Sequence, residues 1–136
     1  MPISTFKFQP KKTHLLRLIN SGGEGTQIFS IDNHKLMVIA NDYTPIKPYE
    51  TEFVTIGQGQ RADVIVRGTG DPKQSYYMRS SISACDPVFN PNALAAIYYP
   101  RADKTKLPTS QSRPNPSPDP CKNVSLNSNL HSLVIC

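Results

Sequence analysis

The chain has 136 residues with a formal net charge of +5, and it contains 13 prolines and no tryptophan. This length allows one domain with a core of useful size followed by a tail, and the composition favours an all-β domain with long connections. The lysines and arginines are scattered rather than gathered in a stripe with aromatic residues, which argues against a nucleic-acid partner. No apolar run approaches the roughly 20 residues that span a bilayer, so no membrane partner is expected, and the N-terminal segment lacks the apolar core of a signal peptide.

Apolar and polar residues alternate with a period of two along most of the chain up to residue 99, as expected of half-buried strands. Residues 1–12 are polar and are expected to lead into the first strand. Pro45 and Pro48 interrupt the alternation, so an edge strand or a bend is expected at 46–50. The predicted strands, in chain order, are 14–20, 27–32, 35–41, 52–56, 61–67, 75–80 and 94–99.

Turn residues separate these strands, first at 21–23 (Ser-Gly-Gly) and then at 32–34 (Asp-Asn-His). We therefore predict an antiparallel meander at the start and, over about seven short strands, a Greek-key sandwich or barrel. From Thr109 to Pro120 the chain is rich in proline, serine, asparagine and glutamine, which is typical of an extended linker. The predicted division is a β-domain at 1–108 and a proline-rich tail at 109–136.

The three histidines, His14, His34 and His131, lie far apart along the chain. A blue-copper site needs two histidines and a cysteine at short spacing, and a zinc site usually shows Cys-x-x-Cys or His-x-His pairs. Neither pattern occurs, so we expect the chain to bind no metal of its own. The glycines at 57 and 59 are not followed by the Lys-Ser/Thr of a phosphate loop, and no Gly-x-Ser-x-Gly nucleophile elbow occurs, so no self-sufficient catalytic constellation is recognisable.

Several polar residues receive structural rather than catalytic interpretations. His34, at a hairpin turn, is expected to make hydrogen bonds rather than to bind a metal, and Asp32 is expected to cap the same turn through its side chain. Asp42 could reach the rim of a pocket, but a turn role is favoured. Arg61 and Asp63 lie on one face of their strand, where pairing with a neighbouring strand or domain is expected.

The chain has three cysteines, Cys85, Cys121 and Cys136, which allow either one disulfide with one thiol left over or three free thiols. A bridge between Cys85 and Cys121 would tie the proline-rich tail to the domain and would contribute roughly 4 kcal/mol in the chain-entropy treatment. Asn123 begins an Asn-Val-Ser glycosylation sequon. The sequon and a disulfide would both favour a secreted protein.

Five sequence segments carry a family resemblance. In chain order they are HLLRLINSG (14–22), FSIDNH (29–34), VIANDYTPIKP (38–48), IGQGQRADVIV (56–66) and AAIYY (95–99). Together they resemble the second cupredoxin-like domain of fungal multicopper oxidases, and most of all the laccase-like branch of ascomycetes. The resemblance covers about residues 5–109. It implies a cupredoxin-like Greek-key β-sandwich that is the middle of three such domains in one enzyme.

In that family the copper ions are held by the first and third domains, so the resemblance agrees with the lack of a metal-ligand pattern here. It implies that the chain is a fragment, inactive alone, which acts as a spacer between flanking domains 1 and 3 and forms one wall of a phenol-binding pocket. The intact enzyme would contain copper and couple phenol oxidation to the reduction of O2 to water. The resemblance also implies secretion and a disulfide between Cys85 and Cys121.

The resemblance singles out Glu24 as a substrate-binding residue. Laccases carry an acidic residue in the loop between the first two of these strands, and Glu24 lies five residues before Phe29. A carboxylate can take the hydroxyl proton of a phenol during oxidation, because oxidised phenols are much stronger acids. Gly23 and Gly25 would let the substrate approach the backbone closely. The alternative is an exposed, solvated glutamate.

A second hypothesis is a copper-free β-sandwich that works alone as a binding or adhesion module. The two hypotheses differ in the surface that they require. A middle domain needs two exposed apolar faces where the flanking domains dock. An independent module is instead expected to be a monomer with a fully polar surface.

Overall fold

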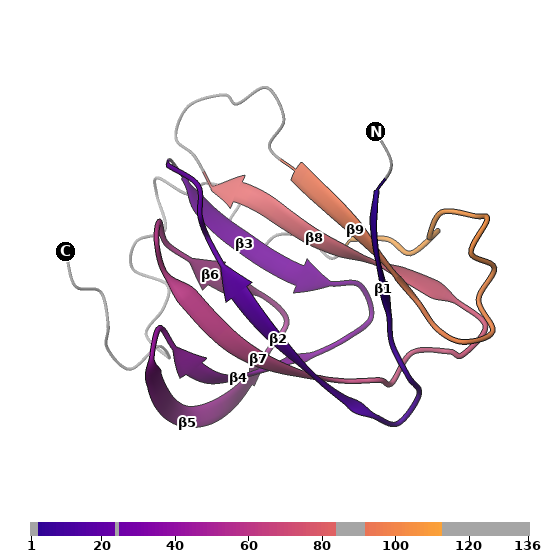
Figure 1. Cartoon of the computed structure of the whole chain (residues 1–136), viewed down its shortest axis with the longest axis horizontal. Helices are drawn as coiled ribbons and strands as arrows, with labels where there is room; N and C mark the ends of the chain where they lie inside the picture. Colours follow the sequence, from indigo (N-terminus) through magenta and orange to yellow (C-terminus); the bar gives the residue numbers. More distant parts are fainter. Residues whose placement is uncertain (1–2, 24, 84–91, 113–136) are drawn as a thin grey trace.

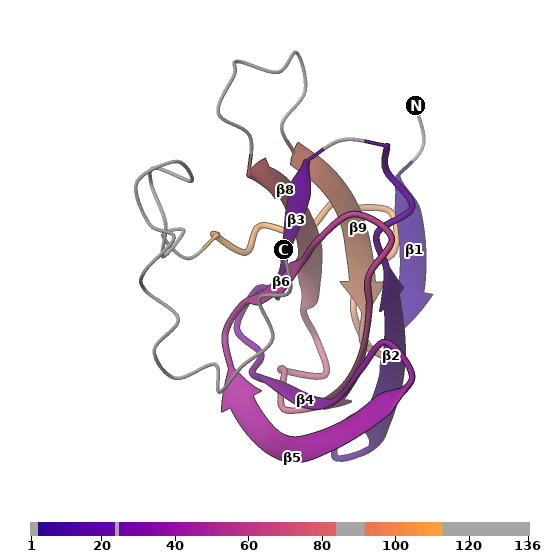
Figure 2. The same ribbon diagram turned by 90° about the vertical axis from the view of Figure 1, so that its left-hand side faces the viewer.

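The computed structural model describes residues 3–23, 25–83 and 92–112. These residues form two β-sheets packed face to face (Figure 1, Figure 2). The strands are β1 (Ser4–Lys7), β2 (Thr13–Ile19), β3 (Thr26–Ile31), β4 (Leu36–Asn41), β5 (Thr44–Thr51), β6 (Val54–Ile56), β7 (Arg61–Arg67), β8 (Ser75–Ser83) and β9 (Asn92–Tyr98). The first sheet has the order β1-β9-β8-β3-β6 and the second has the order β2-β7-β4-β5. The predicted all-β sandwich is confirmed.

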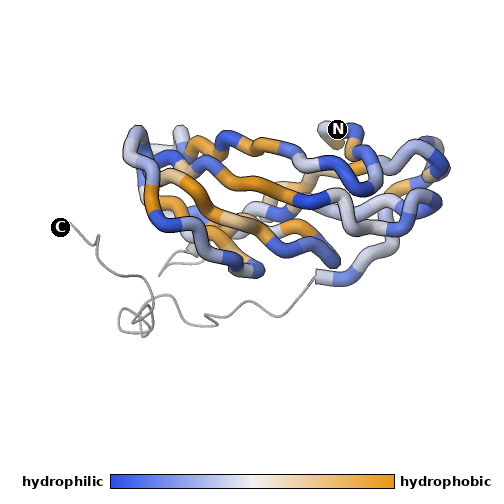
Figure 3. The backbone as a smooth tube through the Cα atoms, turned by 90° about the horizontal axis from the view of Figure 1, so that it is seen from below, coloured by the Kyte–Doolittle hydropathy of each residue, from blue (hydrophilic) through white to orange (hydrophobic). Residues whose placement is uncertain are grey.

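The interior of the sandwich is built from alternate residues of its strands. Along β7 the even-numbered residues are buried and the odd-numbered ones are half-buried or exposed, which is the period of two of a strand. Figure 3 shows the resulting apolar bands along the strands, with hydrophilic turns between them. The core draws on both sheets and includes Ile31, Leu36, Val38, Val64, Val66 and Ile97. In the described part of the chain, no helix is long and apolar enough to cross a membrane.

The pairing of the strands differs from the predicted meander. β2 pairs with β7, so that Leu16 lies opposite Val64. β3 belongs to the other sheet, where it lies between β6 and β8. The connection from β2 to β3 therefore crosses from one sheet to the other. The prediction of a meander is wrong because alternation identifies a strand but carries no information on its partner.

The expected polar lead-in at residues 1–12 contains a strand. β1 pairs in parallel with β9, and Ser4 lies opposite Ala95. All four residues of β1 are exposed, and Phe6 is the one apolar residue among them, so no alternation marks this strand in the sequence. Its partner is supplied by residues at the other end of the domain.

β5 is the outer strand of the second sheet, as expected of a segment that contains Pro45 and Pro48. Proline has no backbone N–H, so the free edge of β5 offers few donors to another chain. A register shift between Val38 and Ala40 interrupts the pairing of β4 with β5, and β5 follows a strongly curved path in Figure 2.

The chain after β9 turns back across the first sheet, and we call residues 100–112 the strap. The Tyr98 hydroxyl donates to the carbonyl of Lys106 in the strap at 2.9 Å. Ser110 bonds to the Asp32 carboxylate and to the N–H of Tyr77. Contacts between the strap and the sandwich thus extend to Ser110, and the domain boundary at 108 remains a prediction.

Candidate functional site

The loop between β2 and β3 carries the predicted substrate residue. Glu24 itself lies outside the described residues, but both ends of its loop are defined. The Asn20 side chain, 4% exposed, donates through Nδ2 to the carbonyl of Gly25 at 3.1 Å and to the carbonyl of Ile56 at 3.0 Å. Its Oδ1 accepts the N–H of Gly22 at 3.1 Å. One amide therefore joins the two ends of the loop to each other and to β6.

The backbone of Asn20 fixes the same loop against the turn between β6 and β7. Its N–H donates to the carbonyl of Gln60 at 3.1 Å, and its carbonyl accepts the N–H of Gly59 at 3.0 Å. Gly59 has a positive φ of 69°, a conformation that glycine adopts without steric cost. Asn20 is thus the anchor of the loop through both its side chain and its backbone.

Sequence reasoning missed Asn20. Its one signal in the sequence is a polar amide that ends an apolar strand directly before Ser-Gly-Gly. The partner that makes it an anchor, Ile56, lies 36 residues further along the chain, so the role is visible only in three dimensions.

The two glycines beside Glu24 meet different needs. Gly25 has a φ of 82°, and a Cβ added to it would lie 2.7 Å from Cγ2 of Ile82. Gly25 is therefore required both by the backbone conformation and by the lack of space. At Gly23 an added Cβ would have no described atom within 4 Å. The loop is open at that point, as close approach of a substrate requires.

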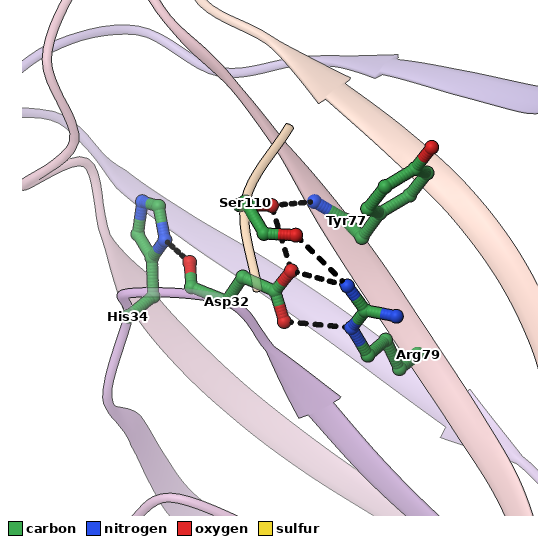
Figure 4. Close-up of polar contacts among 5 residues, drawn as sticks. All are labelled: Asp32, His34, Tyr77, Arg79 and Ser110. Carbon is green, nitrogen blue, oxygen red and sulfur yellow. Dashed lines mark hydrogen bonds and ion pairs between the residues drawn. The ribbon is translucent and has the colours of Figure 1, made fainter. Parts of the chain in front are cut away.

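A second buried polar cluster lies just after β3 (Figure 4). The Asp32 carboxylate, 1% exposed, receives two hydrogen bonds of 2.8 Å from Arg79, from Nε to Oδ1 and from Nη2 to Oδ2. The Ser110 hydroxyl donates to Oδ2 at 2.6 Å and accepts the N–H of Tyr77 at 3.1 Å. Arg79 also donates to the Ser110 carbonyl at 3.1 Å. The bidentate ion pair joins β8 to the residue after β3, and the hydrogen bonds of Ser110 to both of its members fasten the strap to the first sheet.

The predicted turn-capping role of the Asp32 side chain is wrong. The carboxylate is directed to Arg79 of β8, 47 residues away in sequence, and it is the Asp32 carbonyl that accepts a 2.8 Å hydrogen bond from Nδ1 of His34. The side-chain hydrogen bond with Asp32 raises the pKa of Arg79, so the guanidinium stays charged. The local rule fails because a guanidinium offers a stronger, charge-assisted partner than a turn N–H.

His34 is 1% exposed and both of its ring nitrogens are hydrogen-bonded. Nδ1 faces the carbonyl of Asp32 and therefore carries the hydrogen, so in the neutral ring Nε2 accepts from the Tyr99 hydroxyl at 2.8 Å. The Tyr99 oxygen in turn accepts the N–H of Gly70 at 3.1 Å. Burial raises the pKa of the Tyr99 phenol. The prediction that His34 makes structural hydrogen bonds is confirmed.

The structure also places the remaining charged residues of the sequence analysis. Asp42 has a φ of 51° and its Oδ1 accepts the N–H of Arg61 at 2.9 Å, which confirms its turn role. Oδ2 of Asp63 lies 4.0 Å from Nε of Arg17 in the neighbouring β2. The Arg61 guanidinium lies 3.9 Å from the centre of the Tyr43 ring. The expected pairing with a neighbouring strand is confirmed for Asp63.

Apolar side chains are exposed in two areas of the surface. One is the outer face of the second sheet, where Leu15 lies opposite Ile65 and Ile65 lies opposite Met37. The other surrounds an opening between β1 and β2, near Phe6 and Leu94, which are 46% and 43% exposed. The surface is therefore not the fully polar one that an independent module requires.

The multicopper oxidase family model matches residues 1–102. The chain belongs to the multicopper oxidase family. An oxidoreductase of Beauveria bassiana is 38% identical over 87% of this chain and 20% of its own length, and a laccase of Arthroderma benhamiae is 36% identical over 70% and 16%. The crystal structure of the laccase from Botrytis aclada matches with a TM-score of 0.73 at 36% identity, over 82% of this chain and 21% of that one. The chain thus has the fold of a laccase-like cupredoxin domain and spans about a fifth of the length of these relatives.

The described residues of this multicopper oxidase chain do not fit a copper site. No three His, Cys, Asp or Glu side chains among them are grouped so that they could hold a metal ion. His34 is engaged in the core, and the His14 ring stacks on Phe8 at 4.1 Å and accepts the N–H of Gln9 at 3.1 Å. The copper that the family implies belongs to the intact enzyme. That this chain supplies no ligand remains a prediction, because His131 lies outside the described residues.

Three other predicted site residues of the oxidase chain, Cys85, Cys121 and Asn123, also lie outside the described residues. The disulfide between the two cysteines and the glycosylation of the asparagine therefore remain predictions. The described residues include the rest of the loop between β2 and β3, the strap and the exposed apolar side chains.

Proposed function

We propose that this chain acts as the middle, copper-free domain of a secreted laccase-like multicopper oxidase that couples phenol oxidation to the reduction of O2 to water. Its role is to hold flanking domains 1 and 3 and to form one wall of the phenol pocket. The observation that carries the proposal is an apolar cluster on the outer face of the second sheet, where Leu15, Ile65 and Met37 lie side by side.

The two faces of the second sheet differ in what covers them. Val64 of the inner face is fully buried, and its partner Leu16 packs against the same core. On the outer face Leu15, Ile65 and Met37 lie side by side across β2, β7 and β4, and Leu15 is 51% exposed. Antiparallel sheets with one face in water usually carry polar residues there. An apolar cluster on the outward side of the sheet, beside the charged Arg17 and Asp63, supports the docking of a neighbouring domain.

The loop between β2 and β3 is the proposed wall of the phenol pocket. Glu24 in this loop accepts a hydrogen bond from the phenol hydroxyl and takes the proton as the phenol is oxidised, because the oxidised phenol is a much stronger acid. The anchor at Asn20 supports this role, since a carboxylate displaced by about 1 Å loses most of the benefit of its orientation. The substrate is thus a small phenolic molecule.

The docking role is tested in the intact oxidase by limited proteolysis. Leu15→Glu places an unpaired charge under the neighbouring domain, and the cost of burying it should raise the rate of cleavage at the domain junctions severalfold. Leu107→Glu is the matched control, since Leu107 is 60% exposed and lies in the strap rather than on the second sheet. Equal cleavage rates for the two variants would contradict the proposal.

The proposed secretion is tested by peptide mapping without reduction. We expect Cys85 and Cys121 in one linked peptide pair and Cys136 in a separate peptide, because the bridge would join the domain to its tail. A bridge that contains Cys136 would refute this assignment.

A further inference from the structure

β1 and β2 lie on the same side of the sandwich (Figure 2). A groove opens between the two sheets on this side. Its volume is about 490 Å³, within the roughly 300–1,000 Å³ of sites that enclose a ligand. It reaches into the core, and both sheets contribute to its apolar wall. The main lining residues are Phe6, Leu16, Leu18, Phe29, Met78 and Ala95.

The core is left open on this side. Leu16, Leu18 and Phe29 pack against the buried cluster but are only half-buried themselves. At the rim, Phe6 and Leu94 are 46% and 43% exposed. Exposed apolar surface that continues a core marks a place where another apolar surface docks.

The strands that flank the groove also have free backbone edges. Within the described residues β1 pairs with β9 alone and β2 pairs with β7 alone, so each presents unpaired N–H and C=O groups on its other side. At the opposite edge of the second sheet, β5 contains Pro45 and Pro48, which lack a backbone N–H. β2 (Thr13–Ile19) contains no proline, so its edge can accept another strand.

We infer that an extended strand of polypeptide, supplied by another part of the same oxidase, completes the sandwich: it pairs with the free edge of β2 and places alternate apolar side chains in the groove. This inference rests on the proposed function, because the occupant comes from the rest of that enzyme. The chain spans about a fifth of the length of its relatives, so a longer oxidase has ample polypeptide to supply one strand. The 7 residues of β2 offer an edge of roughly 23 Å at about 3.3 Å per residue.

The charges around the groove indicate the chemistry of the strand. Arg17, whose side chain is 75% exposed, is a charged residue of the lining. Arg79 also lines the groove, but its charge is already paired with Asp32. Lys7 and Lys104 line an adjoining hollow together with Phe6. Neither lining includes a carboxylate, so the strand is expected to carry Asp or Glu on its solvent side.

The test uses the full chain and an array of short overlapping synthetic peptides that tile the Botrytis aclada laccase, together with peptides that cover residues 113–136 of this chain. We expect one run of overlapping laccase peptides, with alternating apolar residues, to bind. In solution that peptide should slow hydrogen exchange in β2 and leave the far edge strand β5 unchanged. N-methylation of alternate peptide nitrogens should abolish binding, because it removes the backbone donors.

Two variants locate the site. Phe6→Ser combined with Leu94→Ser should weaken the affinity for the peptide about tenfold or more, because both side chains provide apolar contact at the rim. Ile19→Ser is the matched control, since Ile19 is 65% exposed on β2 but does not line the groove. The affinity of the Ile19→Ser variant for the peptide should not change. All three side chains are substantially exposed, so the variants should stay folded, which thermal unfolding checks.

Failure of every laccase peptide to bind would overturn the inference, as would equal weakening by Ile19→Ser. Binding only by a peptide from residues 113–136 would overturn it too, because the occupant would then be the chain's own tail. A dimer in sedimentation that the double variant abolishes would identify a second copy instead, with the same consequence. Leu15 lines both the groove and the outer face of the second sheet, so the proposed function is judged separately, by phenol oxidation in the Glu24 variants. No described residue of the loop that carries Glu24 lines the groove.

Discussion

The two buried polar anchors of this domain, Asn20 and Asp32, do similar work by different means. Asn20 is neutral, and its side chain bonds to backbone groups of its own loop and of β6. Asp32 is charged, and its carboxylate bonds to the guanidinium of Arg79 and to the hydroxyl of Ser110. The amide holds the loop between β2 and β3, whereas the ion pair binds Ser110 of the strap.

This difference predicts how much stability is lost when one partner of each anchor is substituted. A hydrogen bond from a buried amide to the backbone contributes about 1 kcal/mol net. A buried ion pair contributes little net stability, but removing one partner costs about 3–5 kcal/mol because the other charge is left uncompensated. The strap is therefore the more fragile of the two regions to single substitutions.

Arg79→Met should have the largest effect on stability. It leaves the Asp32 carboxylate, 1% exposed, without its cation, so the free energy of unfolding should fall by about 3–5 kcal/mol in urea denaturation. Lys35→Met is the matched control, because it breaks an exposed ion pair with Glu50 and should cost at most about 1 kcal/mol. Similar losses in the two variants would remove the proposed contrast between the anchors.

Glu24→Ala, in the intact oxidase, tests what the loop held by Asn20 contributes. Loss of a charge-assisted hydrogen bond to the phenol should lower kcat/KM by about ten- to a hundredfold, or roughly 1.5–3 kcal/mol. Glu24→Gln keeps the size but removes the base, so it separates proton acceptance from packing. Electron donors without an ionisable hydroxyl should be nearly unaffected, and equal losses for both kinds of donor would show that Glu24 only shapes the loop.

Asn20→Ala should have a smaller effect on stability than Arg79→Met. It leaves the buried carbonyl of Ile56 and the partly buried carbonyl of Gly25 without the Asn20 donor, and should lower the free energy of unfolding by about 1–3 kcal/mol. Gln58→Ala, at an exposed position of the adjoining turn, is the control and should change stability by less than about 0.5 kcal/mol. In the intact oxidase Asn20→Ala should also reduce phenol turnover while sparing non-phenolic donors.

The smallest expected effect is on the dependence of stability on pH. Burial raises the pKa of Tyr99, so its contribution to stability is fully present below the unfolded-state value of about 10 and is lost as the pH rises through the folded-state value. The free energy of unfolding should therefore fall as the pH rises above about 10. Tyr99→Phe should flatten this fall in denaturation curves at stepwise pH, whereas Tyr43→Phe, at an 82% exposed position, should leave it unchanged.

Local patterns in the sequence were sufficient to predict the strands whose side chains form the core. β7 was predicted at 61–67 and begins and ends at those residues, because every second residue is apolar. β1 could not be predicted, since its residues show no alternation and its partner β9 lies at the far end of the domain. Strand partners in general depend on the closure of the whole sandwich, which no local window contains.

In the candidate site too, roles set by residues near in sequence were predicted, and roles set by distant residues were not. The position of Asp42 in a turn and the bond of His34 to the Asp32 carbonyl, two residues away, follow from short-range chemistry, and both roles were predicted. The true partners of the Asp32 carboxylate, Arg79 and Ser110, are 47 and 78 residues away, so a local rule assigned it to the wrong role. Asn20 was missed for the same reason, because its side chain donates to the carbonyl of Ile56 in the distant strand β6.

The parallel pairing of β1 with β9 has a consequence for how the domain folds during synthesis. Ser4 lies opposite Ala95, so β1 leaves the ribosome roughly 5–20 seconds before its partner at about 5–20 residues per second. Until then the growing chain exposes an unpaired strand and the apolar surface beside it. In a nascent chain of this domain the first strand therefore waits longer for its partner than one that pairs with its neighbour in sequence.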